Sequence, residues 1–242
     1  MAHFYLNEDT AEASTGDRIT ISGPEARHAV TVSRVRVGES LVIGNGSGLV
    51  LTGEVAVAEP GELTVVVETA TTTPPASPAV WLAQALAKGD RDEYAVQAAS
   101  ELGVDGVIPW SAQRSIVRWE GQKVRKGHER WSAIVREATK QSMRPWLPDV
   151  APLVSTKQLA ALAASTRMLV LDPAASVGLG SIVVDDRDIV LVVGPEGGIS
   201  DGELALLTDA GAELVRLGGG ILRTSTAGPA ALAILNVALG RW

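Results

Sequence analysis

The sequence predicts an α/β domain with a mostly parallel sheet, preceded by a small β-barrel or sandwich. Residues 16–69 contain short runs rich in Val, Ile, Leu and Thr separated by turn residues, which is typical of small all-β domains. Residues 79–240 instead alternate apolar runs with helix-patterned segments, which indicates a parallel sheet covered by helices. Between them, TATTTPPASPA (69–79) has no periodicity and predicts a linker. We therefore expect domains over residues 1–72 and 73–242.

The first domain is expected to carry basic residues beside its strands. Arg34 and Arg36 alternate in sequence, so we expect them on one strand face, close to Arg27 and suited to contact phosphates. His28 fits either a contact to the same ligand or a structural histidine, and the residues do not decide between the two. The turn GNGSG (44–48) separates two of the strands, which are predicted at 18–22, 40–44, 49–58 and 62–68.

The second domain is expected to bind its ligand at one edge of the sheet. Its strands are predicted at 79–86, 106–110, 167–172, 188–193 and 213–218, and its helices at 91–103, 124–143, 200–211 and 224–240. In such sheets, ligands bind beyond the carboxyl ends of the strands. Three loops rich in small residues follow predicted strands, at 171–176, 194–198 and 217–228. Because glycine lets a ligand approach the backbone closely, we interpret these loops as the walls of one crevice.

Composition excludes several kinds of site. The 242 residues include no cysteine, which rules out disulfides, thiolate metal sites and a cysteine nucleophile. The histidines lie far apart and show no metal-ligand spacing, so we expect no metal. The N-terminus lacks a basic start followed by an apolar run, and no uncharged stretch reaches the length of a membrane span. We expect a cytoplasmic protein with no membrane partner.

The net charge of −7 conceals a basic block. Residues 113–144 contain nine basic and three acidic side chains, whereas the rest of the chain is acidic. Such a block is typical of a surface that binds a polyanion, although a solvated helix face fits the charges equally well. Trp110, Trp119, Trp131 and Trp146 lie in or beside the block. They either stack on nucleic-acid bases or belong to the core, and we expect at least two of them to be core.

The loop GPEGG (194–198) does not match a phosphate-binding loop. The chain has neither GxxxxGK[ST] nor GxGxxG after the first strand of a βαβ unit. Glu196 also places a carboxylate at the centre of the loop, where it would repel a pyrophosphate. A ligand with a positive reacting end, held by backbone hydrogen bonds to its base and ribose, suits the loop better. S-adenosyl-L-methionine, a sulfonium cation, is such a ligand.

Several segments resemble one family of enzymes. GPEGGIS..E (194–203) and LGGGILRTSTA (217–227) are similar to the SPOUT superfamily of RNA methyltransferases. Further segments resemble its RsmE-type members, which methylate N3 of a uridine in 16S ribosomal RNA: HAVTVSRVRVGE (28–39), KGDRDEYAVQAASELGVDGVIP (88–109), SAQRSIVRW (111–119) and REATKQSMRP (136–145). The resemblance implies a PUA-like first domain, a second domain with a C-terminal trefoil knot, and a homodimer. It also implies S-adenosyl-L-methionine as cofactor and the 16S rRNA of the small ribosomal subunit as partner.

The resemblance, together with the charges of the loop and the chemistry of methylation at N3, predicts roles for individual residues. The cofactor would be held by Leu171, Gly194, Glu196, Gly198, Leu217, Gly218, Leu222 and Thr224. Arg223 and Arg144 would donate hydrogen bonds to O2 and O4 of the uracil as N3 loses its proton, and Glu137 would orient the RNA or Arg144. The predicted RNA contacts are Arg27, His28, Arg34, Arg36, Lys88, Arg91, Arg114, Arg118 and Lys140. The chain departs from the family at Ser225, where Glu is usual, and at Ala98, where Lys is frequent.

Three other functions stay open on the sequence. Another SPOUT activity would methylate a ribose 2′-oxygen or a transfer-RNA base, and the PUA-like first domain argues against it. A non-catalytic rRNA-binding assembly factor would carry a vestigial crevice, which the intact GPEGG and ILRT loops disfavour. A Rossmann-type nucleotide enzyme is the least consistent, because both of its phosphate-binding fingerprints are missing.

Overall fold

The computed structural model describes residues 4–242, and the chain divides into two compact units. The first unit contains the chain up to Pro75 together with Thr139–Leu147. The second unit contains Ala76–Ala138 and Pro148–Trp242. The first unit is therefore built from two separate stretches of sequence.

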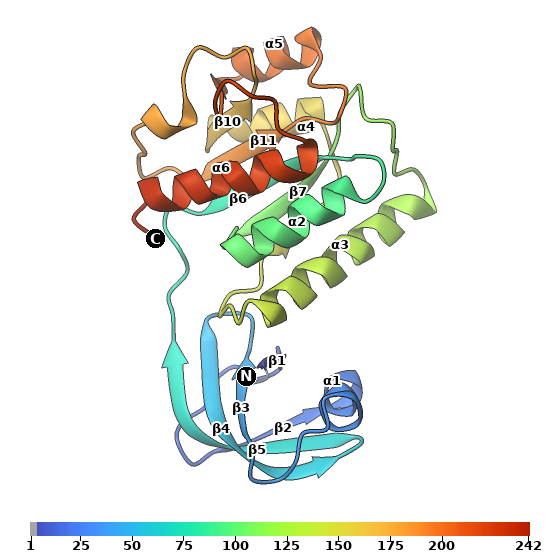
Figure 1. Cartoon of the computed structure of the whole chain (residues 1–242), viewed down its shortest axis with the longest axis vertical. Coiled ribbons are helices and arrows are strands. Elements are labelled where there is room, and N and C mark those ends of the chain that lie inside the picture. Colours follow the sequence, from blue (N-terminus) through green and yellow to red (C-terminus); the bar gives the residue numbers. More distant parts are fainter. Residues whose placement is uncertain (1–3) are drawn as a thin grey trace. The chain divides into compact units, whose positions relative to one another are not determined.

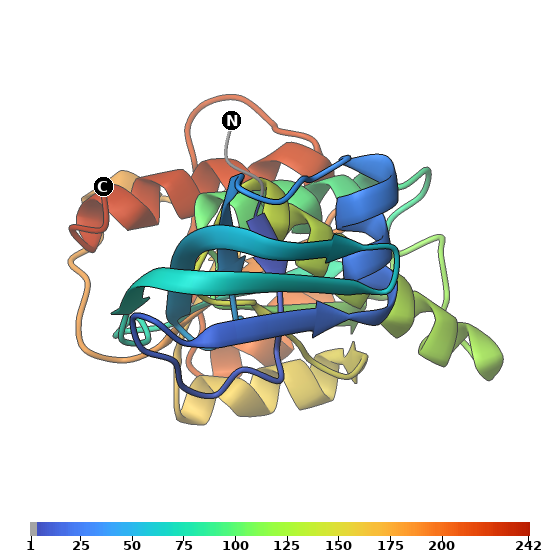
Figure 2. The same cartoon turned by 90° about the horizontal axis from the view of Figure 1, so that it is seen from below.

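Within the described residues, the first unit holds a curled five-stranded sheet in the order β1-β3-β4-β5-β2. Its strands are β1 (Phe4–Leu6), β2 (Arg18–Ser22), β3 (Ser40–Gly44), β4 (Leu49–Glu59) and β5 (Glu62–Thr72). Only the pair of β1 and β3 is parallel among these strands. Figure 2 shows the long strands β4 and β5 curving side by side. Their inward side chains enclose one apolar core, which confirms the predicted all-β domain. The structure extends β5 to Thr72, so the first residues of the predicted linker are strand instead.

The segment that follows β2 is helical. It forms α1 (Gly23–Arg27) and a π-helical turn (His28–Val32), after which the chain continues as a loop. Pro24 lies in the first turn, where its fixed φ favours a helix start, and the buried Ala26 and Ala29 pack this segment on the core. The prediction that Arg34 and Arg36 lie on one strand face is therefore wrong, because both belong to this loop, and the φ of +57° at Arg34 is left-handed.

The second stretch of the first unit packs against the glycine-rich turn after β3. Trp146 forms a bridge with Ser47, and its indole Nε1 donates to the carbonyl oxygen of Thr73 at 2.9 Å. A side chain at Gly48 would lie 2.9 Å from the Trp146 ring, so only glycine fits there. This contact ties residues 139–147 to the β-domain.

The second unit contains a parallel sheet, as predicted. Its order within the described residues is β12-β10-β11-β6-β7-β8, with β9 also paired to β7, and all these pairs are parallel. β11 enters between β10 and β6, which come earlier in the chain. The strands are β6 (Val80–Ala85), β7 (Gly106–Ser111), β8 (Asp149–Val150), β9 (Val154–Ser155), β10 (Arg167–Leu171), β11 (Ile189–Val193) and β12 (Glu213–Val215).

Helices cover both faces of this sheet. Figure 1 shows α2 and α6 on one face and α4 and α5 on the other. The helices are α2 (Arg91–Leu102), α3 (Gln122–Gln141), α4 (Thr156–Ala161), α5 (Asp201–Asp209) and α6 (Thr224–Ala238). Trp110 and Trp131 are buried, which confirms that at least two of the four tryptophans are core. Trp119 meets Trp131 edge to face, with ring centroids 5.4 Å apart.

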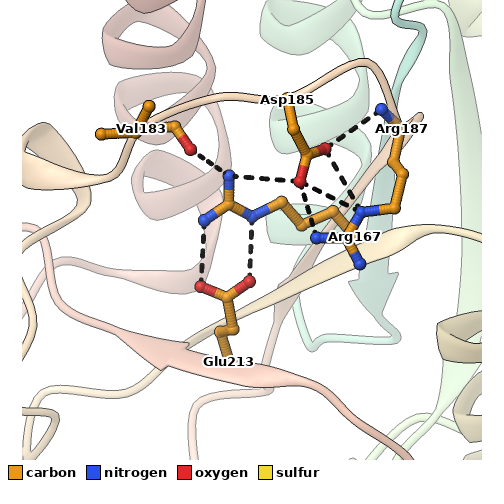
Figure 3. A network of polar contacts seen from close by, with 5 residues as sticks. All are labelled: Arg167, Val183, Asp185, Arg187 and Glu213. Atoms are coloured by element: carbon orange, nitrogen blue, oxygen red, sulfur yellow. Dashed lines mark hydrogen bonds and ion pairs between the residues drawn. The ribbon is translucent and has the colours of Figure 1, made fainter.

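An arginine clamp joins the amino ends of three neighbouring strands (Figure 3). Arg167, the first residue of β10, makes a bidentate ion pair with Glu213, the first residue of β12, at 2.9 and 3.1 Å. Its guanidinium also donates to the carbonyl oxygen of Val183 and lies 4.0 Å from Asp185, which pairs with Arg187 at 2.7 Å. The clamp holds the segment that leads into β11 and fixes the strands from the edge opposite their carboxyl ends.

Candidate cofactor site

A cavity of about 480 Å³ lies at the carboxyl ends of β10, β11 and β12. The three loops that follow these strands line it, as the sequence predicts for a crevice. The lining includes Leu171, Gly194, Glu196, Gly198, Leu217, Gly218, Leu222 and Thr224, which are the eight residues that the resemblance assigns to the cofactor. Its size falls within the range of about 300–1,000 Å³ that is usual for small-molecule sites.

The loop after β11 is shaped by glycine. A side chain at Gly194 would place its Cβ 2.6 Å from Cγ1 of Ile199, which is closer than two carbon atoms approach. Gly198 has a φ of +72°, a left-handed conformation that glycine adopts without strain. The loop therefore folds tightly back on itself and presents its backbone to the cavity.

A chain of two hydrogen bonds ties this loop to α6. The Thr224 hydroxyl donates to the carbonyl oxygen of Gly194 at 2.7 Å. The Thr224 oxygen in turn accepts from Nε2 of Gln84 on β6 at 2.8 Å. Gln84 is not among the predicted site residues, although an amide inside the otherwise apolar strand VWLAQA is an unusual feature that points to it.

The carboxylate of Glu196 is paired with a cation and with a backbone donor. Its carboxylate pairs with Arg91 at 2.8 Å and accepts a hydrogen bond from the backbone N–H of Lys88 at 3.0 Å. Partial burial raises the pKa of this carboxyl, but the backbone hydrogen bonds of Glu196 and Lys88 and the charge of Arg91 outweigh burial and lower it. The cavity wall thus combines an ionised carboxylate with a guanidinium, since Arg91 also lines it.

The loop before α3 supports the glycine loop from outside. Arg114 donates to the carbonyl oxygens of Gly197 and Ile199 at 3.2 and 3.3 Å. Glu203, at the start of α5, accepts from the backbone N–H of Gln113 and from the hydroxyl of Thr156, both at 2.8 Å. Glu203 is the last residue of the motif GPEGGIS..E, but its partners Gln113 and Thr156 lie far away in the sequence and are not predicted from it.

The three predicted catalytic residues lie in different places. Arg223 lines the cavity at the start of α6. Within residues 4–242, its side chain makes no ion pair or hydrogen bond, so the guanidinium is available to a ligand. Glu137 and Arg144 are not among the residues that line the cavity. Glu137 belongs to the second unit and Arg144 to the first.

The predicted RNA contacts differ in exposure: all except Lys140 are exposed in part or in full, and Lys140 is largely buried. Arg27, His28, Arg34, Arg36 and Lys88 are exposed, and so are Arg91, Arg114 and Arg118 in part or in full. Arg118 nevertheless uses its guanidinium to hold the carbonyl oxygens of Ala112 and Gln113 at 2.6 and 2.8 Å. The side chain of Lys140 is only 12% exposed and pairs with Glu25 at 3.1 Å, so its charge serves the first unit.

Neither a membrane span nor a metal cluster is found in the described part of the chain. No helix there is long and apolar enough to cross a bilayer. No group of three or more His, Asp or Glu side chains in residues 4–242 is arranged to hold a metal ion.

Comparison with known proteins gives a consistent result. Two family models match the chain, an RNA methyltransferase domain over residues 74–236 and an RNA methyltransferase PUA domain over residues 21–68. The ribosomal RNA small subunit methyltransferase E of Mycobacterium bovis is 42% identical over 94% of this chain and 89% of its own length. The protein of the same name from Bacillus subtilis is 28% identical over 98% and 96%.

Solved structures agree with this result. A ribosomal RNA small subunit methyltransferase E from Neisseria gonorrhoeae, bound to S-adenosyl methionine, has a TM-score of 0.88 and 30% identity, with 98% of both chains covered. A methyltransferase from Legionella pneumophila with the same cofactor has a TM-score of 0.86 and 29% identity, again over 98% of both chains.

Proposed function

Because the chain belongs to the family of ribosomal RNA small subunit methyltransferases E, we propose that it methylates N3 of a uridine in 16S ribosomal RNA. The methyl donor is S-adenosyl-L-methionine, the cofactor bound in the neighbouring structures. One observation carries the proposal: the cavity at the carboxyl ends of β10, β11 and β12 gathers all eight residues that the resemblance assigns to this cofactor.

The residues present in the cavity fit this cofactor. Leu171, Leu217 and Leu222 supply apolar surface for an adenine, and the loop after β11 offers backbone groups for hydrogen bonds. The ionised carboxylate of Glu196 makes the wall suitable for a sulfonium cation. Arg91, which is paired with this carboxylate, offsets part of its negative charge. When bound, the cofactor supplies an electrophilic methyl group.

The chain's own part in the reaction is to position the uracil and stabilise its charge. Removal of the N3 proton spreads negative charge onto O2 and O4, and a cation near these oxygens lowers the barrier. Arg223 lines the cavity and has a free guanidinium, which supports its role as that donor. Arg144 as a second donor, and Glu137 as the residue that orients the RNA or Arg144, remain part of the proposal on the charge chemistry at N3. No base is assigned for the N3 proton, and loss of this proton to water stays an open route.

RNA contacts are proposed for exposed basic residues in each unit. In the first unit, Arg27, His28, Arg34 and Arg36 extend from the helical segment and the loop that follows it. In the second unit, the exposed residues Lys123, Arg125 and Lys126 occupy the first turns of α3, within the predicted basic block. The proposed partner is the small ribosomal subunit in the cytoplasm.

A homodimer is part of the same proposal. α6 carries a partly exposed apolar stripe that includes Ala230, Ala233 and Ile234, and Val237 and Trp242 are 64% and 61% exposed. A second copy would bury this stripe, and sedimentation equilibrium on the wild type and on Val237→Glu tests the idea. The trefoil knot of the family is proposed as well, and the entry of β11 between β10 and β6 supports it. Pulling on both chain ends tests for the knot, because it leaves the extended chain shorter than an unknotted one.

The decisive experiment uses small subunits from cells that lack this gene. The purified protein and radiolabelled S-adenosyl-L-methionine are added, and the labelled nucleoside is identified after digestion of the RNA. We expect 3-methyluridine. Replacement of Arg223 by alanine should lower kcat by about 100-fold while the cofactor still binds, because a donor to the developing charge is lost. The control is Arg18→Ala, an exposed arginine on β2 outside the cavity.

Other outcomes would identify the alternatives. Label in a different nucleoside would keep the cofactor and contradict the uridine-N3 assignment. Absence of label, despite binding of both the cofactor and the particle, would favour a non-catalytic assembly factor.

A further inference from the structure

A fully buried amide lies in the middle of the second unit's sheet. Gln84 is 0% exposed on β6, where its neighbours along the strand are apolar. Its Nε2 donates to Thr224 and to the carbonyl oxygen of Ala85, at 2.8 and 3.1 Å. Its Oε1 meets no hydrogen-bond donor among residues 4–242. Burial of an incompletely paired amide costs free energy, so this side chain is expected to do something that an aliphatic one cannot.

The direction of the hydrogen bonds shows what the Gln84 side chain does. A carbonyl oxygen only accepts, so the single hydroxyl proton of Thr224 must be the one that points to Gly194. The Thr224 oxygen is then left as an acceptor for Gln84, which must present its nitrogen rather than its oxygen. Gln84 therefore sets the orientation of the hydroxyl, and the hydroxyl holds the carbonyl.

The chain of bonds links two walls of the cavity. Gly194 opens the loop after β11 and Thr224 begins α6, and both line the cavity, whereas Gln84 lies behind them and does not. We propose that Gln84 is a positioning residue, which fixes the Gly194 carbonyl through Thr224 and thereby keeps the cofactor site in its binding shape. This role rests on the proposed function of the cavity.

A double-mutant cycle tests the proposal. The dissociation constant of S-adenosyl-L-methionine is measured by calorimetry for the full chain and for Gln84→Leu, Thr224→Val and the double variant. We expect Gln84→Leu to weaken binding about tenfold, as the loss of a buried hydrogen-bond partner does. The double variant should bind no more weakly than Thr224→Val alone, because Gln84 acts only through that hydroxyl. Thr224→Ser keeps the hydroxyl and should bind within about twofold of the wild type.

The variant Gln84→Glu adds a readout that a purely structural role would not affect. An ionised carboxylate cannot donate to Thr224, whereas a protonated one can. Burial raises the pKa of such a carboxyl, so binding should recover as the pH falls towards mildly acidic values. Gln84→Leu, which has no proton to gain, should keep a constant deficit. In turnover with small subunits, the KM for the cofactor should rise while the KM for the particle stays unchanged.

The outcomes separate this role from the function on which it rests. Equal binding by Gln84→Leu and the wild type would overturn the proposal, and so would additive losses in the double variant. If Gln84→Leu does not fold, the Thr224 pair and the pH series of Gln84→Glu carry the test. Failure of the wild type to bind the cofactor would overturn the assignment of the cavity itself, and this role with it.

Discussion

Gly194 shows how a single missing side chain shapes the cavity. A Cβ at this position would lie 2.6 Å from Ile199 Cγ1 and 3.3 Å from the Ile199 backbone nitrogen. Neither atom is the free end of a flexible side chain, so the loop itself would have to move. Because Gly194 and Ile199 both line the cavity, that movement would change the shape of the site.

Replacement of Gly194 by alanine is therefore expected to weaken S-adenosyl-L-methionine binding by roughly tenfold or more, as overpacking of a close contact does. Gly202→Ala is the matched control, since Gly202 has no atom near its missing Cβ and lies in the first turn of α5. It should leave binding unchanged and stabilise the helix slightly. Calorimetric titration of the two variants side by side checks the prediction, and equal affinities would contradict it.

Individual residues differ in how far the sequence reveals them. Gly194, Gly198 and Thr224 stand in motifs, so the family resemblance predicts them for the cofactor site from the sequence alone. Gln84 acts through a residue 140 positions away, and no spacing in the sequence indicates that partnership. The amide in an apolar strand is a visible anomaly, but only the fold shows which hydroxyl it meets.

At the level of elements, the start of α5 connects the cavity loop to the rest of the second unit. Ser200 and Glu203 form a reciprocal capping box at the start of this helix, which confirms the helix predicted from residue 200. The same Glu203 carboxylate also binds the loop before α3 and the start of α4, through Gln113 and Thr156. One carboxylate thus joins three segments around the site.

The pH dependence of stability should reflect this carboxylate. Burial raises the pKa of Glu203, but its hydrogen bonds from Gln113, Ser200 and Thr156 outweigh burial and lower it. A carboxyl whose pKa is lower in the folded state stabilises the fold at pH values above its pKa in the unfolded chain, which is about 4.3 for glutamate. This stabilisation is lost as the pH falls towards the pKa of the folded state. The difference in unfolding free energy between the wild type and Glu203→Gln should therefore shrink on acidification.

Chemical denaturation between neutral and acidic pH, at fixed ionic strength, measures this difference. Asp201→Asn, an exposed carboxylate on the same helical turn, is the control. A wild-type advantage that stays constant down to the lowest pH would contradict the prediction.

Most elements could be predicted because their local patterns and their packing agree. The strands of the parallel sheet are continuous apolar runs, and α2 ends at Gly103, whose φ of +95° matches a glycine helix terminus. The strand face expected for Arg34 and Arg36 is wrong because alternating Arg and Val residues imitate a strand. In the structure these residues form a loop after the helical turn, where Val35 is buried and its N–H donates to the carbonyl oxygen of Ala29 at 3.0 Å.

For the whole molecule, the distribution of charge along the chain affects the binding of a polyanion more than the net charge does. The chain has a net charge of −7, yet residues 113–144 carry nine basic and three acidic side chains. A polyanion bound by this block releases counterions, so its affinity falls as salt rises.

Lys123→Glu combined with Lys126→Glu should weaken binding to small subunits at low salt and reduce the slope of log affinity against log salt by about 1–2. Lys157→Glu, a charge reversal at an exposed lysine on α4 outside the block, is the control to compare with each single reversal and should have little effect. Filter binding across a salt series checks this. An unchanged slope in the double variant would mean that the block is a solvated helix face and not an RNA surface.

The discontinuous first unit is the part of the architecture that sequence patterns could not reveal. The Pro-rich segment before Pro78 suggests a simple boundary between two successive domains. The segment Thr139–Leu147 belongs to the first unit through contacts between Trp146, Gly48 and Thr73. No local sequence pattern predicts these contacts.

This return of the chain to the first unit has a consequence for synthesis. When the first 75 residues leave the ribosome, the β-domain still lacks the segment that covers its glycine-rich turn, and it receives Trp146 only after Ala76–Ala138 of the second unit has also emerged. The nascent chain must therefore hold an unfinished N-terminal domain through the translation of β6, α2, β7 and α3. Completion of the first domain and the growth of the second are thus coupled in time, because each unit is built from two separate stretches of the chain.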